Sequence, residues 1–152
     1  GLLAAIGIQT GQPVAEIGAG GGYLTQKLAA AVGPTGKVVA TDIDEAALAS
    51  LRSRLAALPQ VEARRVQPAE SGLEVGRYDV IVLADVVHLL PQPERYLPAL
   101  FLSLRPGGHL FVSGREDRRP LLDDAAVGAG LRVRPLLVSL PAQFVVELLP
   151  PK

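Results

Sequence analysis

The stretch Val14-Ala15-Glu16-Ile17-Gly18-Ala19-Gly20-Gly21-Gly22-Tyr23-Leu24-Thr25 decides the fold of this chain. It predicts a short buried strand, a turn with four glycines in five residues, and then a helix. Glycine permits positive φ and lets a ligand approach the main chain without meeting a Cβ atom. The helix that follows directs its unpaired N–H groups at the same place. We therefore expect a small molecule with an anionic or strongly polar group at this turn.

The spacing of these glycines distinguishes two kinds of nucleotide site. A dinucleotide turn needs a small third residue, so that helix and strand pack closely over a pyrophosphate. That position is occupied here by Tyr23, which is too large. The pattern that fits is an acid followed by alternating glycines, formed by Glu16, Gly18, Gly20 and Gly22. An NAD(P)-dependent oxidoreductase is therefore disfavoured, and its Tyr-x-x-x-Lys pair would have to come from Tyr23 inside this same motif.

Composition excludes several other classes. The chain has 152 residues, which predicts one domain, residues 1–152, with a core of its own. Its 15 basic and 15 acidic side chains cancel, so no overall field favours nucleic acid or an anionic membrane. With no cysteine there is no thiolate metal site or cysteine nucleophile, and we expect no metal. No apolar run is long enough for a membrane span and no signal peptide opens the chain, so we expect a cytoplasmic protein.

Local clusters of basic residues need a separate interpretation. They occur at Arg64-Arg65 and at Arg115 with Arg118-Arg119. We interpret them as a solvated strand end and a solvated loop rather than as a binding patch.

Strands alternate with helices along the chain. This alternation predicts an α/β, doubly wound, Rossmann-like and mostly parallel sheet with helices on both faces. The last two strands are joined by a short link containing proline, which favours an antiparallel hairpin. After the first strand and helix, the expected strands are 37–42, 61–66, 78–84, 109–113, 131–140 and 143–149, and the expected helices are 44–58, 93–104 and 120–129.

Asp42 ends the second expected strand and should lie beside the glycine turn. A carboxylate in that place can accept hydrogen bonds from both hydroxyls of a ribose. The alternative is that Asp42 caps the next helix, but Asp44 is the better N-cap. We therefore assign Asp42 to the ribose.

Four segments together resemble the class I S-adenosylmethionine-dependent methyltransferases, in particular the small general (type 11-like) members. They are residues 16–22, 39–44, 78–90 and 104–110, and their order makes the combination specific. The resemblance implies a seven-stranded sheet in the order 3-2-1-4-5-7-6 with the last strand antiparallel. It also implies S-adenosylmethionine as the cofactor and methyl transfer to a small-molecule acceptor. The alternative function is a non-catalytic domain that binds the cofactor or a partner.

The resemblance also implies which residues contact the cofactor. The family often has an acid after the third strand that binds the adenine amino group, and Gln67 stands there, with Glu70 as the alternative. A glutamine amide can accept from the adenine amine and donate to the neighbouring ring nitrogen. The implied cofactor-binding residues are Glu16, Gly18, Ala19, Gly20, Gly22, Asp42, Ile43, Gln67, Pro68 and Asp85.

Methyl transfer from a sulfonium requires little beyond alignment of donor and acceptor. A general base is needed only when the acceptor is a hydroxyl or a protonated amine. Asp85 and His88 are the catalytic candidates, although Asp85 could instead be a cap or contact the methionine part of the cofactor, and His88 could line a helix surface. The Asn-Pro-Pro-Tyr motif of amino-group methylators is replaced by residues 85–88, which favours a small metabolite as acceptor.

Only residues 1–13 precede the first strand, whereas many family members carry N-terminal helices that roof the substrate site. Leu2 to Ile8 can form one or two helical turns. We therefore expect either an open substrate pocket or a lid that is absent from this sequence. An open pocket would leave apolar surface exposed, which a second copy could cover as a homodimer.

Overall fold

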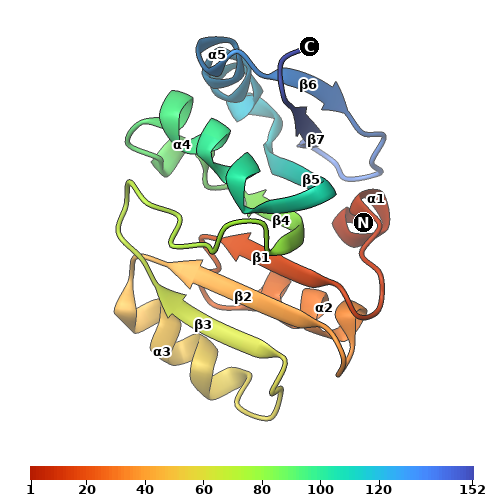
Figure 1. Cartoon of the computed structure of the whole chain (residues 1–152), viewed down its shortest axis with the longest axis vertical. Coiled ribbons are helices and arrows are strands. Elements are labelled where there is room, and N and C mark those ends of the chain that lie inside the picture. Colours follow the sequence, from red (N-terminus) through yellow and green to blue (C-terminus); the bar gives the residue numbers. More distant parts are fainter.

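β1, the strand before the glycine turn, lies in a mixed sheet of seven strands in the order β3-β2-β1-β4-β5-β7-β6 (Figure 1). A computed structural model describes residues 1–152. β1 to β5 run parallel to one another, and β7 is antiparallel to both β5 and β6. The predicted strand order and the C-terminal hairpin are therefore confirmed. The strands are β1 (Pro13–Ile17), β2 (Lys37–Asp42), β3 (Val61–Arg65), β4 (Tyr78–Ala84), β5 (Leu104–Arg115), β6 (Arg132–Pro135) and β7 (Gln143–Leu149).

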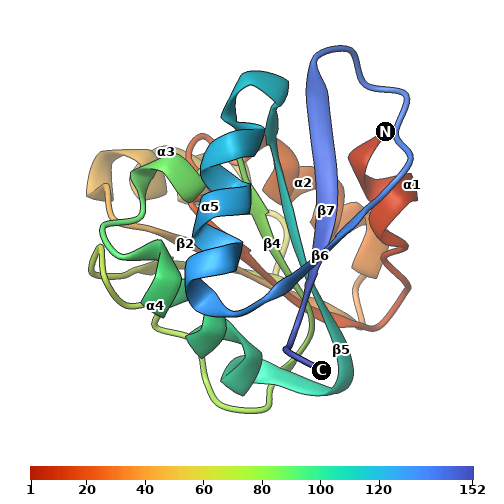
Figure 2. The ribbon, with the colours of Figure 1, turned by 90° about the horizontal axis from the view of Figure 1, so that it is seen from above.

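Five helices cover the two faces of this sheet, as Figure 2 shows for α4 and α5 on one side and α1 and α2 on the other. Side chains alternate across the central strands, so Val14 of β1 packs with α1 and α2 while Ile17 packs with α4 and α5. Strands covered on both faces must be apolar almost throughout, which explains the composition of β4. The helices are α1 (Leu2–Ile6), α2 (Tyr23–Val32), α3 (Glu45–Arg54), α4 (Pro93–Leu100) and α5 (Arg119–Ala129).

Two helices end several residues before the predicted position. α3 ends at Arg54 rather than near Leu58, because the residue before Pro59 is disfavoured from helical geometry and the chain leaves the helix a turn earlier. α4 ends at Leu100 and continues as a short 3-10 turn, Phe101–Ser103 (η2), before β5.

Two predicted strands also had the wrong extent. β5 already begins at Leu104, which pairs with Tyr78, and residues 105–108 form a bulge before regular pairing resumes at His109. β6 is much shorter than the predicted strand 131–140. Beyond the hydrogen bond from Leu136 N to Val145 O, the segment leaves the edge of the sheet.

A buried carboxylate joins the three C-terminal strands. Glu147 on β7 has a side chain only 5% exposed, and it pairs with His109 of β5 at 2.6 Å and with Arg134 of β6. Burial raises the pKa of Glu147, but the hydrogen bonds from Arg134 and His109 outweigh burial and hold that pKa below its usual range. The ionised form of Glu147 therefore stabilises the hairpin against β5.

Replacing this carboxylate by an amide should destabilise the fold. We expect Glu147→Gln to lower the free energy of unfolding by about 1–3 kcal/mol, measured by urea denaturation. Because the folded pKa lies below the unfolded one, the contribution is present above pH 4.5 and is lost as the pH falls through the folded pKa. The variant should lack this dependence. The exposed, unpaired Glu116 offers a control, since Glu116→Gln should leave stability unchanged; equal stability of both variants would contradict this assignment.

Candidate active site

A cavity of about 250 Å³ opens at the carboxyl ends of β1, β2, β3 and β4. β1 pairs with β2 on one side and β4 on the other, so the cavity lies where the strand order reverses. Ligands of doubly wound sheets bind at this place. Its wall is made by Ile17, Gly18, Gly20, Thr41, Asp42, Ile43, Val66, Gln67, Pro68, Val86, Leu89, Leu90 and Tyr96.

The glycine turn forms one side of this cavity. Gly18 has φ +74°, and a Cβ atom on it would lie 2.5 Å from Cγ1 of Val86. Non-bonded carbon atoms do not approach so closely, so a side chain at position 18 would push Val86 and the segment after β4 away from this turn. Gly22, with φ +89°, then starts α2.

Asp42 fastens the turn from the neighbouring strand. Its Oδ2 accepts the N–H of Gly20 at 2.8 Å, and its Oδ1 accepts the N–H of Asp44 at 3.0 Å. A carboxylate has further lone pairs, so both oxygens can still accept hydrogen bonds from a ligand in the cavity. Asp44 accepts the N–H of Ala46 at 2.9 Å, which confirms it as the N-cap of α3.

Glu16 lies behind the turn and does not line the cavity. It is 2% exposed, and its Oε1 accepts the hydroxyl of Thr25 at 2.6 Å. Burial raises the pKa of Glu16 to about 7; the Thr25 hydrogen bond lowers it and the charge of Asp42 raises it. Ala19 and Gly22 are also outside the wall of the cavity. These three residues shape the turn, and their contact with a ligand remains a prediction.

The segment after β3 supplies the polar end of the cavity. Gln67 and Pro68 line it, whereas Glu70, the alternative to Gln67, lines a neighbouring cavity instead. Arg64 anchors the segment, because it donates to the carbonyl of Gly72 at 2.9 Å and pairs with Glu74 at 2.8 Å. Arg64 is therefore a structural residue rather than part of a binding patch, but the prediction of a solvated strand end was wrong for it, because its side chain is only 22% exposed and is paired.

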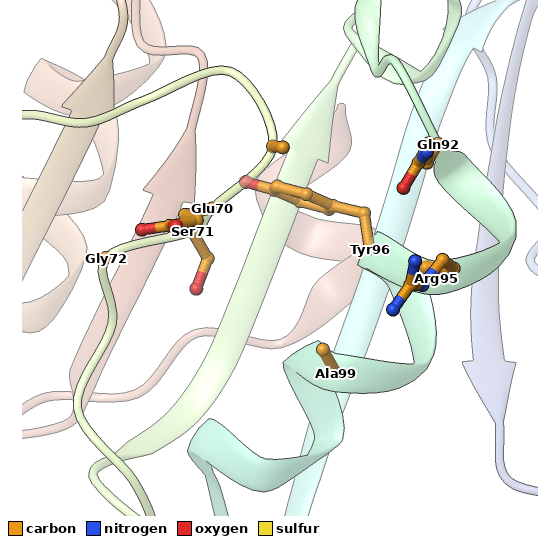
Figure 3. A pocket seen from close by; sticks show the side chains of 8 residues that line it. Glu70, Ser71, Gly72, Gln92, Arg95, Tyr96 and Ala99 are labelled. Atoms are coloured by element: carbon orange, nitrogen blue, oxygen red, sulfur yellow. The ribbon is translucent and has the colours of Figure 1, made fainter.

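The neighbouring cavity has a volume of about 490 Å³ and lies between the segment after β3 and α4 (Figure 3). Glu70, Ser71 and Gly72 face Gln92, Arg95 and Ala99 across it. Tyr96 belongs to the walls of both cavities. The sequence did not single out this tyrosine, because an aromatic residue at helical spacing among leucines is typical of a core position.

Asp85 and His88, the two catalytic candidates, are brought together by Arg118. Asp85 directly follows β4 with φ +57°, and its Oδ1 accepts from Nη1 of Arg118 at 2.9 Å. The same Nη1 lies 2.9 Å from Nε2 and 3.2 Å from Nδ1 of His88. Our interpretation of Arg118 as a solvated loop residue was wrong, because its side chain is only 31% exposed and contacts Asp85 and His88. The only sequence feature that pointed to this contact was the place of Arg118 just after β5, the strand beside β4.

A further cavity of about 540 Å³ lies on the other side of Asp85. It faces the carboxyl ends of β4 and β5, and α1 and the segment before β7 form part of its wall. α1 is the short N-terminal helix that was predicted. The lining residues are Gly1, Leu2, Leu3, Ala4, Tyr23, Leu24, Lys27, Ala84, Asp85, Ser113, Leu140 and Gln143.

Comparison with known proteins identifies this arrangement. A family model described as "Methyltransferase domain" matches residues 15–110, which is more than half of the chain. The chain belongs to the class I S-adenosylmethionine-dependent methyltransferases. No helix in this methyltransferase has the length and hydrophobicity needed to cross a membrane. No three histidine or acidic side chains come together as a metal site would require.

Two curated relatives and one solved structure illustrate the similarity. The chain is 35% identical to the ubiquinone/menaquinone biosynthesis C-methyltransferase UbiE of Ectopseudomonas mendocina over 70% of its own length and 43% of the relative's. It is also 35% identical to the trans-aconitate 2-methyltransferase of Variovorax paradoxus, over 77% of its length and 44% of the relative's. The chain thus spans less than half the length of these two relatives.

The solved structure shares the fold. It is a SAM-dependent methyltransferase from Aquifex aeolicus, which superposes with a TM-score of 0.84 at 24% identity over 97% of this chain and 86% of the other.

Replacement of Asp42 tests the ribose assignment. Asp42→Ala should weaken binding of S-adenosylhomocysteine at least about tenfold by calorimetry, because two charge-assisted hydrogen bonds to the ribose are lost. The matched control is Asp44→Ala, which removes the cap of α3 and should cost about 1 kcal/mol of stability without changing the affinity. Equal affinities of the two variants would contradict the assignment of Asp42 to the ribose.

Proposed function

We propose that this chain transfers the methyl group of S-adenosylmethionine to a small-molecule acceptor. The observation that carries the proposal is that one cavity wall combines the glycine turn, Asp42 and Gln67. Glycines let the cofactor lie against the main chain, and an acid at the end of β2 suits the two hydroxyls of a ribose.

The residues of the cavity fit the parts of the cofactor in order. Ile43, Val86 and Leu89 offer apolar surface to the faces of the adenine, and Gln67 can reach its polar edge. Asp42 holds the ribose. The methionine part would follow the turn past Gly18 towards Asp85. When bound, the sulfonium supplies an electrophilic methyl group with a neutral leaving group.

The acceptor would enter through the cavity of 540 Å³, because that cavity shares Asp85 with the end of β4. An arginine N–H can only donate, so a ring nitrogen of His88 that accepts from Arg118 must carry a lone pair. Arg118 occupies that lone pair, so His88 could take the proton of a hydroxyl acceptor only when the acceptor displaces Arg118 from this nitrogen. Arg118 also holds the carboxylate of Asp85 in place, which leaves its second oxygen to orient the acceptor.

The relatives supply the acceptor classes to test. One is named for C-methylation in ubiquinone and menaquinone biosynthesis, and the other for methylation of trans-aconitate. We therefore propose quinone precursors with a phenolic ring and small carboxylates as the first two groups in an acceptor panel.

Cofactor selectivity is the first test. Calorimetry should show S-adenosylmethionine and S-adenosylhomocysteine binding in the micromolar range, on the order of −7 to −8 kcal/mol. NADH should bind far more weakly, because Tyr23 occupies the position that a pyrophosphate turn leaves open. Preference for NADH would refute the proposal.

Turnover over the acceptor panel is the second test. For a hydroxyl acceptor, His88→Gln should lower kcat about 100-fold with unchanged affinity for S-adenosylhomocysteine, since a general base contributes on this order. The chain offers a matched control in His109, the other histidine, which pairs with Glu147 away from the site. His109→Gln should leave kcat unchanged. Cofactor binding without turnover of any acceptor would favour the non-catalytic alternative.

The expectations about the partners and the location of this protein remain predictions. Tyr23, Ile43 and Leu89 are exposed apolar residues at the ends of the strands and helices around the site. A second copy could cover them, and sedimentation at several concentrations would reveal such a dimer. The cytoplasmic location and the lack of nucleic-acid and membrane partners likewise stay predictions.

A further inference from the structure

Tyr96 is placed at the boundary between the cofactor cavity and its neighbour. Its side chain extends from α4 towards the segment that carries Glu70 and Ser71, with the hydroxyl at the far end of the ring (Figure 3). The residue is 7% exposed and belongs to the walls of both cavities. Its ring is therefore held by packing, while its hydroxyl lies where a ligand could reach it.

This hydroxyl has no hydrogen-bond partner within the protein. The contrast is with Tyr78, whose hydroxyl donates to Oε1 of Glu74 at 2.7 Å. No buried side-chain nitrogen or oxygen of this protein lacks a partner, so the Tyr96 hydroxyl is open to the cavities and is not sealed in the core. Burial raises the pKa of Tyr96 to about 12, so the phenol is protonated at neutral pH and can both donate and accept.

The polar groups of the cofactor cavity are few, and most already have a role. Asp42 and the glycines lie at the turn, and the hydroxyl of Thr41 contacts the carbonyl of Glu16. Gln67 and Tyr96 remain as the polar side chains beside the apolar surfaces of Ile43, Leu89 and Leu90. An adenine has apolar faces and a polar edge, so it matches a cavity in which apolar surfaces lie beside two polar side chains.

We propose that the hydroxyl of Tyr96 hydrogen-bonds the polar edge of the cofactor's adenine, alongside Gln67, and makes Tyr96 a specificity-determining residue. This inference rests on the proposed function, because it places the adenine in this cavity. The hydroxyl can accept from the exocyclic amine or donate to a ring nitrogen. Two neighbouring groups of this kind fix the rotation of the base, and with it the direction in which the rest of the cofactor leaves the cavity.

Removal of the hydroxyl alone tests the inference. Tyr96→Phe should weaken S-adenosylhomocysteine about 3- to 10-fold, the value of one hydrogen bond, with an unchanged unfolding midpoint because no protein partner is lost. The matched control is Tyr78→Phe, which should lower the midpoint through loss of the bond to Glu74 and leave the affinity within about twofold. Unchanged affinity in Tyr96→Phe would overturn the inference.

Cofactor analogues show whether the lost contact is to the base. Analogues of S-adenosylhomocysteine that lack the exocyclic amine, N1 or N7 should each bind the wild type more weakly if that atom is contacted. For at least one of them, the penalty should disappear in Tyr96→Phe, and equal penalties in both proteins for all three would overturn the inference.

Adenosine as a second probe separates this inference from the proposed function. Suppose that the wild type binds adenosine but not S-adenosylhomocysteine, and that Tyr96→Phe binds adenosine more weakly than the wild type. This result would support the base contact and refute methyl transfer. A wild type that binds neither would overturn both.

Discussion

The close approach of β1 and β4 at Gly18 is the constraint on which the rest of the site depends. Val86 fills the space that a side chain at position 18 would need, so the segment after β4 can fold back over the turn. That one contact places the apolar wall of Val86 and Leu89 opposite Ile43. It also brings Asp85 to the wall of the cavity of about 540 Å³. A methyl group added to Gly18 would separate these parts, although no catalytic group would be altered.

Carboxylates around the turn have different tasks because their surroundings differ. Glu16 is enclosed and acts through Thr25, whereas Asp42 lies at the edge of the cavity with free acceptor capacity. Asp85 is the most exposed of the three and forms a salt bridge with the guanidinium of Arg118. The ends of three adjacent strands thus carry a buried structural acid on β1, an acid at the cavity edge on β2 and an exposed acid after β4.

The parts of the site that the sequence could predict are those set by local geometry. Gly18, Gly20, Asp42 and Gln67 follow strand ends in a parallel sheet, so their meeting at one edge follows from the alternation of strands and helices. Arg118 and Tyr96 could not be found in this way. Arg118 depends on side-chain reach between neighbouring strand ends, and Tyr96 on which face of α4 meets the cavity. The predicted bounds of β5 and β6 were wrong, because a bulge in β5 and the edge position of β6 depend on the partner strand and not on the local sequence pattern.

The two edge strands of the sheet have a consequence for how copies of this protein meet. An open strand edge offers unpaired N–H and C=O groups to another chain and promotes aggregation, which charge and proline discourage. β3 presents Glu62, Arg64 and Arg65, and β6 is only four residues long, with Arg132, Arg134 and a terminal proline. Both edges are thus poor templates for a further strand. Growth of the sheet into a continuous intermolecular ribbon is disfavoured, and contact between folded copies has to use side-chain surfaces instead.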